Sequence, residues 1–266
     1  MVSICGEDYD INTTELSLSG KELTEIPEQV FLLKELTCLD LSYNSLVQLP
    51  DDIRKLTKLE TLLLHHNDIN MMLPIVYKLS SLLYLRELYL GYNNLKAIPH
   101  AVKYLSSLEV LSVPYNKITY LPMISLPNLS AFILSHNEIK SIEHTQHLHK
   151  LQYFYVDHNP ITHIPSGIFQ LEHLQSFVAN NCEVKNIPSN ISSCLDKLDR
   201  MEFYIHHNPL NDFSLKNEDN AQEIQKHYAD IQTCSKILNK IRIQLWFSKY
   251  VIPNYYEVSD KICIGI

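Results

Sequence analysis

One pattern of apolar residues, LxxLxLxxNxL, occurs eight times in this 266-residue chain and constrains its fold more than any other feature. The first full copy places Leu36, Leu39, Leu41 and Asn44 at the first four fixed positions, and a partial copy precedes it at residues 16–23. The ninth position of the template is filled, in chain order, by Asn44, Asn67, Asn93, Asn116, Asn137, Asn159, Cys182 and Asn208.

Successive copies are 21 to 26 residues apart, and a period in this range is typical of a solenoid in which each repeat contacts only its neighbours. The alternating LxL segment predicts one short strand per repeat, with its leucines pointing inward and the residue between them pointing outward. The asparagine side chain carries a donor and an acceptor that can satisfy backbone groups where the strand ends. We therefore expect these asparagines to be structural rather than catalytic.

A second motif, (I/L)PxxIxxLxxL, fills the remainder of most repeats. A proline at the start of a helical turn loses no needed donor, and apolar residues three and four apart give the turn one buried side. The sequence therefore predicts an α/β fold: a curved parallel sheet on the concave face and short helices or turns on the convex face. Ile142-Glu143 departs from this motif, whose proline pairs are Ile26-Pro27, Leu49-Pro50, Ile98-Pro99 and Ile164-Pro165.

Over residues 13–210 the two motifs resemble those of leucine-rich-repeat (LRR) proteins of the intracellular type, whose repeats are about 22–23 residues long. The chain also looks like the short LRR effectors that some intracellular bacteria inject into host cells. This resemblance implies a non-enzymatic scaffold that binds a protein or peptide on its concave face. Two alternatives remain open: a ubiquitin-ligase-type effector or adaptor, for which the residues after the repeats look too few, and a regulatory subunit of a phosphatase or GTPase.

The chain divides into three predicted parts: an N-terminal cap at 1–12, about nine repeats at 13–210, and a C-terminal helical cap at 211–266. Apolar residues recur at helical spacing through 217–250. A solenoid's last repeat exposes its core, so we expect this helix to cover that end. The alternative is a helix that engages a second partner.

The chain carries 22 Lys and Arg against 30 Asp and Glu, a formal net charge of −8, without a basic cluster. This balance argues against nucleic acid and against anionic membrane surfaces as ligands. No stretch approaches the 18 or more apolar residues of a membrane span. The six cysteines form no CxxC pair, which favours reduced thiols. We expect a cytoplasmic monomer or, for an effector, a protein secreted by the bacterium into the host cytosol.

The outward strand positions predict where a partner binds. Tyrosine combines large contact area with a polar tip and is favoured at binding hot spots, whereas an outward aliphatic residue serves no core. The residues at the eighth position of each repeat have an alternative interpretation, as packing between neighbouring strands. The predicted contact residues are Leu63, Tyr89, Tyr92, Tyr115, Ile133, Tyr153, Tyr155, Val178, Tyr204, His136 and His158.

The thirteen histidines invite a metal-site interpretation, since His136 and His158 are neighbours in the repeat and Asp157 lies beside them. A metal needs ligands that converge in a defined geometry, which ladder positions do not guarantee, so we expect no metal and no cofactor. With only five glycines there is no phosphate-binding loop, and no GxSxG or HExxH motif occurs. We therefore do not expect an enzyme.

Overall fold

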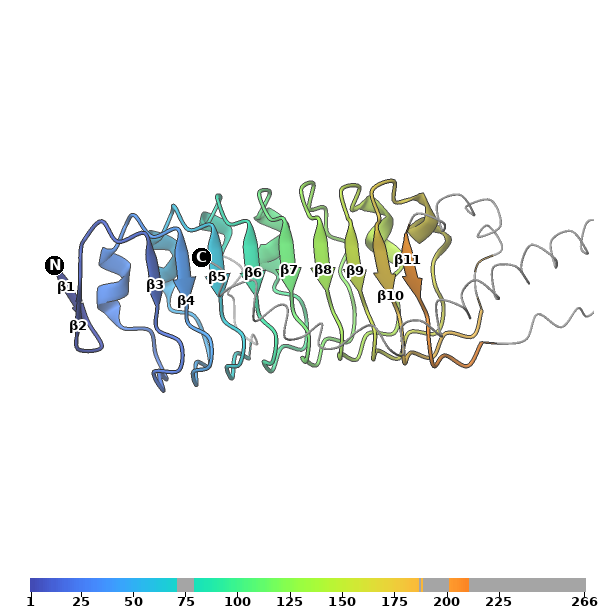
Figure 1. Ribbon diagram of the computed structural model, residues 1–266, viewed down its shortest axis with the longest axis horizontal. Coiled ribbons are helices and arrows are strands. Elements are labelled where there is room, and N and C mark those ends of the chain that lie inside the picture. The colour runs from blue at the N-terminus through green and yellow to red at the C-terminus, as the bar shows by residue number, and fades with distance from the viewer. Residues whose placement is uncertain (71–78, 187, 189–200, 211–266) are drawn as a thin grey trace, which may run out of the picture.

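The computed structural model describes residues 1–70, 79–186, 188 and 201–210. Nine short parallel strands stand side by side in chain order, from β3 to β11 (Figure 1). Every pair is in register by repeat position, as in Leu62 opposite Leu88, which confirms the predicted solenoid. The strands are β3 (Glu15–Ser17), β4 (Cys38–Asp40), β5 (Thr61–Leu63), β6 (Glu87–Tyr89), β7 (Val110–Ser112), β8 (Ala131–Ile133), β9 (Tyr153–Tyr155), β10 (Ser176–Val178) and β11 (Glu202–Tyr204).

The middle residue of each strand points into one continuous apolar core. Leu39, Leu62 and Leu88 have no exposed surface, and their counterparts in the last four strands are phenylalanines. Those rings pack along the axis with centroids 5.4 to 5.8 Å apart. The core therefore changes from leucine to phenylalanine along the solenoid, while the position that points inward stays the same.

Short helical turns lie behind the sheet, on the side opposite its outer face (Figure 1). All helices in the described part of the chain are 3-10 helices of three to five residues, because the link between strands has room for about one turn. Four of them begin directly after the motif prolines, which confirms the predicted helical turns. They are η1 (Glu28–Leu32), η2 (Asp51–Lys55), η4 (Leu79–Ser81), η5 (His100–Tyr104), η6 (Glu143–His147) and η7 (Ser166–Gln170).

A small antiparallel hairpin precedes the repeats. Its strands, β1 (Val2–Ile4) and β2 (Glu7–Tyr9), are joined by Cys5 and Gly6 with φ of 52° and 84°. Val2 and Ile4 are buried in the core at the end of the solenoid. The helix predicted for 211–266 lies outside the described residues.

The repeat asparagines link each repeat to the one before it. In the repeat of β7, Asn116 Oδ1 accepts the backbone N–H of Leu95 at 2.9 Å, and Asn116 Nδ2 donates to the carbonyl oxygen of Leu90 at 2.9 Å. The asparagines therefore have the structural role expected from the sequence. The same two-way link is made by Asn44, Asn67, Asn93, Asn116, Asn137, Asn159 and Asn208.

Cys182 interrupts this series. Its Sγ lies 3.5 Å from the carbonyl oxygen of Val156, a weaker bond than an amide would make, and it cannot reproduce the asparagine's strong acceptor. The Ile161 N–H that would meet an asparagine oxygen instead donates to the carbonyl oxygen of Asn159 at 2.8 Å. The Ile161 N–H is thus satisfied within its own turn, and the hydrogen bond that would link it to the next repeat is missing.

Candidate interaction surface

The outer face of the sheet is formed by the residues on either side of each inward-pointing strand centre. Because the strands are in register, these side chains form two columns, one from the third and one from the fifth position of the repeat. Neighbouring strands are about 4.8 Å apart, so side chains within a column contact one another. The predicted contact residues that stand in these two columns are Leu63, Tyr89, Ile133, Tyr153, Tyr155, Val178 and Tyr204.

Exposure within these columns differs from the sequence-based expectation. Tyr153 is 37% exposed, and Ile133 and Val178 are half-buried. Leu63, which was expected to be exposed, is only 3% exposed, and Tyr155 only 6%. The prediction considered only which way a side chain points; it left out the same-face neighbours that cover it on a crowded sheet. Leu63 and Tyr155 therefore contribute to the packing of the outer face more than to its accessible area.

The eighth-position residues form a continuous stack of rings along the edge where the strands end. The six rings run Tyr43, His66, Tyr92, Tyr115, His136, His158, with successive centroids 3.9 to 4.3 Å apart and planes within 13° of parallel. Each residue has a φ of 51° to 55°. This left-handed conformation is costly for a residue with a side chain, and it is repeated in every one of these turns.

This ring stack corrects the placement of four predicted contact residues. Tyr92, Tyr115, His136 and His158 lie in turns after the strands rather than on the strands themselves. Each ring packs on the rings of the neighbouring repeats, which is the alternative the sequence left open. Each pair of stacked rings contributes about 0.5–1.5 kcal/mol in addition to the free energy of burying its apolar area. The stack therefore stabilises the packing of neighbouring repeats.

Carboxylates form a second feature of the surface, which sequence reasoning did not single out. Along the edge where the strands begin, Arg86 lies between Glu60 and Glu109. Its Nε is 3.9 Å from Glu60 Oε2, and its Nη1 is 3.4 Å from Glu109 Oε1. Glu87 accepts a hydrogen bond from the Tyr89 hydroxyl at 3.1 Å. The signal was present in the sequence, since these residues occupy the second and third positions of consecutive repeats.

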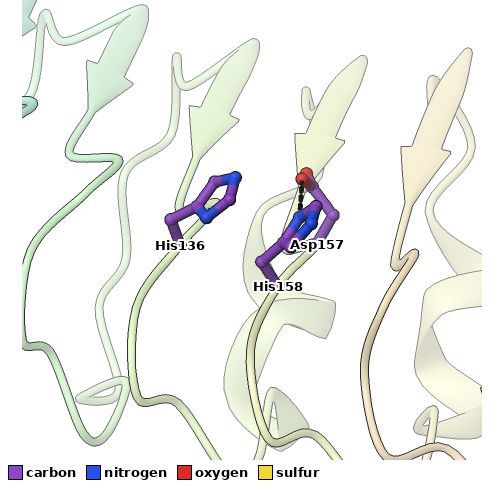
Figure 2. A group of neighbouring side chains, drawn as sticks. All are labelled: His136, Asp157 and His158. Carbon is purple, nitrogen blue, oxygen red and sulfur yellow. Dashed lines mark hydrogen bonds and ion pairs between the residues drawn. The ribbon is translucent and has the colours of Figure 1, made fainter.

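His136, Asp157 and His158 cluster at one end of the ring stack (Figure 2). Asp157 is buried; its Oδ2 lies 3.0 Å from His158 Nδ1, and its Oδ1 accepts the Ser135 hydroxyl at 2.5 Å. Burial, and then the nearby His158, lower the pKa of His136, while Asp157 opposes this shift. The Asp157 carboxylate therefore orients the His158 ring, and the lowered pKa of the neighbouring His136 favours the neutral form of that ring.

The same three residues could each offer a ligand atom to a metal, all within 4.8 Å of one another. The two imidazole rings, however, are stacked at 3.9 Å with an angle of 12° between their planes. An imidazole binds a metal in the plane of its ring, so parallel stacked rings do not aim their nitrogens at one ion. The arrangement suits ring packing, and the expected absence of a metal stays a prediction.

The described cysteines, Cys5, Cys38 and Cys182, are free thiols. Burial raises the pKa of both Cys38 and Cys182 to about 11. Since the thiolate is the reactive form, neither is a nucleophile near neutral pH. Over the described ranges, no helix is long and apolar enough to cross a membrane.

A family model for the leucine-rich repeat matches residues 11–69, and a comparison with curated proteins gave no match. Among solved structures, an LRR protein of Leptospira interrogans is 24% identical with a TM-score of 0.59, covering 82% of this chain and 58% of that one. A TDR receptor is 28% identical with a TM-score of 0.65, covering 74% of this chain and 35% of that one.

The LRR ectodomain of the plant membrane receptor kinase GASSHO1/SCHENGEN3 from Arabidopsis thaliana, solved in complex with CASPARIAN STRIP INTEGRITY FACTOR 2, is 28% identical with a TM-score of 0.59. The match covers 70% of this chain and 23% of the ectodomain. The chain thus spans less than two thirds of each of these structures. Together with the nine-stranded sheet and the asparagine links, these matches show that the chain has a leucine-rich-repeat fold.

Proposed function

We propose that this protein is a non-enzymatic scaffold that binds a protein or peptide partner on the outer face of its sheet, the face predicted to be concave. The observation that carries this proposal is the pair of in-register columns on nine adjacent strands. At about 4.8 Å per strand the face is roughly 40 Å wide, which is enough for a standard protein interface of about 800 Å² per partner.

The composition of the face supports contact with protein. Tyr153, Ile133 and Val178 offer aromatic and aliphatic side chains that point away from the core. Aromatic residues on a rigid sheet bind with little loss of side-chain freedom, which is how hot spots arise. The plant ectodomain, which has a similar fold, was solved in complex with CASPARIAN STRIP INTEGRITY FACTOR 2. That comparison supports the proposal that this fold binds a protein or peptide partner here.

The experiment compares two truncations of exposed tyrosines, one on the outer face and one away from it. Tyr153→Ala removes a ring from the outer face, and Tyr120→Ala removes a more exposed ring, 58% exposed, outside the strands. Partners captured from a cell lysate by the wild-type protein are identified and then titrated with both variants by isothermal calorimetry. We expect Tyr153→Ala to weaken binding by about 2 kcal/mol and Tyr120→Ala to leave it unchanged. Equal affinities for both variants would refute binding on this face.

We further propose a cytosolic setting and, for a bacterial source, a role as an effector delivered into the host cytosol. The free cysteines support a reducing compartment, and the short repeat array resembles that of such effectors. Fusion to a reporter that becomes active only in the host cytosol tests delivery. A signal that is unchanged in a secretion-deficient strain would contradict the effector role. A ubiquitin-ligase adaptor and a phosphatase or GTPase subunit are the alternative roles, which the identity of the captured partner decides.

A further inference from the structure

Charge is distributed unequally along the outer face. On the first five strands, β3 to β7, and the edge where they begin, carboxylates recur at the second, third and fifth positions of the repeat. Arg86 is the basic residue at these positions, and it is bracketed by two of the carboxylates. The carboxylates are Glu15, Asp40, Glu60, Glu87 and Glu109. We call these residues with Arg86 the acidic half.

The following strands, β8 to β10, carry no charged residue at the same three positions, and the last strand, β11, carries the exposed Glu202 at the third position. Ile133, Tyr153 and Val178 supply the apolar area, and the Tyr153 hydroxyl donates to Gln175 Oε1 at 3.1 Å. We call this group the uncharged half; its members are Ser130, Ala131, Ile133, Gln152, Tyr153, Tyr155, Gln175, Ser176 and Val178.

Three carboxylates of the acidic half, those of Glu15, Glu60 and Glu109, are accessible to solvent, and those of Asp40 and Glu87 are half-buried. The side chains of Glu60 and Glu109 are 50% and 47% exposed, and Glu15 is exposed. One guanidinium cannot neutralise five carboxylates, so the half has an excess of negative charge. Such a surface attracts Lys and Arg side chains and repels acidic ones, which determines specificity and the rate of association.

We propose that the partner binds through an extended segment of opposite composition in its two halves: Lys or Arg side chains over the acidic half, and apolar or aromatic side chains over the uncharged half. This inference rests on the proposed function and specifies its ligand. From β3 to β10 there are seven strand spacings, about 34 Å, which an extended segment crosses with roughly ten residues.

The test uses fluorescence anisotropy with four synthetic ten-residue peptides. The first carries four arginines at its amino end and leucine, tyrosine, valine and phenylalanine at its carboxyl end, separated by two serines. The second has the reverse order. The third has the same composition with arginine and apolar residues alternating, and the fourth replaces each arginine in the first with glutamate. The wild-type protein should bind one of the first two about tenfold more tightly than the third, with no measurable binding of the fourth.

Two charge-matched double variants locate the interaction. Glu60→Gln/Glu109→Gln removes two carboxylates from the acidic half, and Glu28→Gln/Glu172→Gln removes two exposed carboxylates outside the strands. An exposed ion pair changes affinity by up to about fivefold, so the first variant should lose about tenfold and the second should bind as wild type. Raising NaCl from about 0.05 M to 0.5 M should weaken wild-type binding and have a smaller effect on the first variant.

Equal binding of the first three peptides, equal losses in the two double variants, or no binding of the first two peptides at about 1 mM would each overturn the inference. Its failure is distinguishable from failure of the proposed function. If Tyr153→Ala weakens binding of the identified natural partner while Glu60→Gln/Glu109→Gln does not, the outer face still binds and only the charge assignment is wrong. If neither change affects that partner, both fail.

Discussion

The links between repeats make Asn116→Ala the most informative perturbation of stability. Asn116 is 8% exposed, and its Oδ1 is the acceptor that the Leu95 N–H meets in the described structure. The Leu90 carbonyl would lose Asn116 but keep Asn93 Nδ2 at 3.1 Å. Similarly, the Val113 carbonyl would keep its bond from the asparagine of the next repeat. The substitution therefore leaves the buried Leu95 N–H without its acceptor. It also removes the hydrogen bonds that Asn116 donates to the Leu90 and Val113 carbonyls, each of which keeps a bond from another asparagine.

The expected cost follows from these contacts. A buried N–H without a partner costs about 2 kcal/mol, and the lost donor bonds add about 1 kcal/mol, so Asn116→Ala should lower the free energy of unfolding by about 3 kcal/mol. Urea unfolding followed by far-ultraviolet circular dichroism measures this loss, and hydrogen exchange should show faster exchange at the Leu95 amide. In the control Asn94→Ala, the lost side chain accepts, among the described residues, a single exposed bond from Lys117 at 3.1 Å, and stability should change by less than about 0.5 kcal/mol. A loss below about 1 kcal/mol for Asn116→Ala, or equal losses in both variants, would refute this reasoning.

Three further predictions concern the same repeats. Cys182→Asn should stabilise the protein by about 1 kcal/mol in urea unfolding, because its amide can bond the Ile161 N–H and the Val156 carbonyl as the other repeats do; destabilisation would contradict this. The buried Ser176 hydroxyl has no partner among the described residues, so Ser176→Ala should leave the thermal midpoint unchanged or raise it, and a fall would argue for a missed hydrogen bond. Because the pKa of His136 is lowered from 6.5, the unfolded chain binds a proton that the folded one resists, and stability falls as pH drops below about 6.5. His136→Gln should reduce that loss between pH 7.5 and 5.5, and an identical pH profile would exclude His136 as its source.

The sequence predicted the fold well because its signal was repeated. A leucine that points inward once is weak evidence, but the same position being apolar in eight copies leaves one arrangement that buries them all. The turns at Pro27, Pro50 and Pro99 were predicted for the same reason. What repetition did not determine was the type of helix, since 3-10 and α turns share the same buried positions over one turn.

The surface was predicted less completely, because position within a repeat gives direction and not exposure. Ile133 and Tyr153 lie on the outer face as expected, whereas Leu63 is covered although it points the same way. Whether a side chain is covered depends on the neighbours above and below it, and these come from residues more than 20 positions away in sequence. The positive φ at the ring stack belongs to the turn, and its signal in the sequence was confined to Gly20 and Asn181, which fill the same eighth position with φ of 66° and 50°.

The two-way asparagine link has a consequence for how such a chain can change in length. Each amide bonds its own turn and the preceding one, and reaches no further. Removing one whole repeat that carries the asparagine would therefore join two repeats whose edges match, so that the donors on one side meet equivalent acceptors on the other. Excising half a period would leave a leucine row facing water. The molecule can thus be shortened or lengthened in whole units, and the span of its outer face would change by one strand at a time.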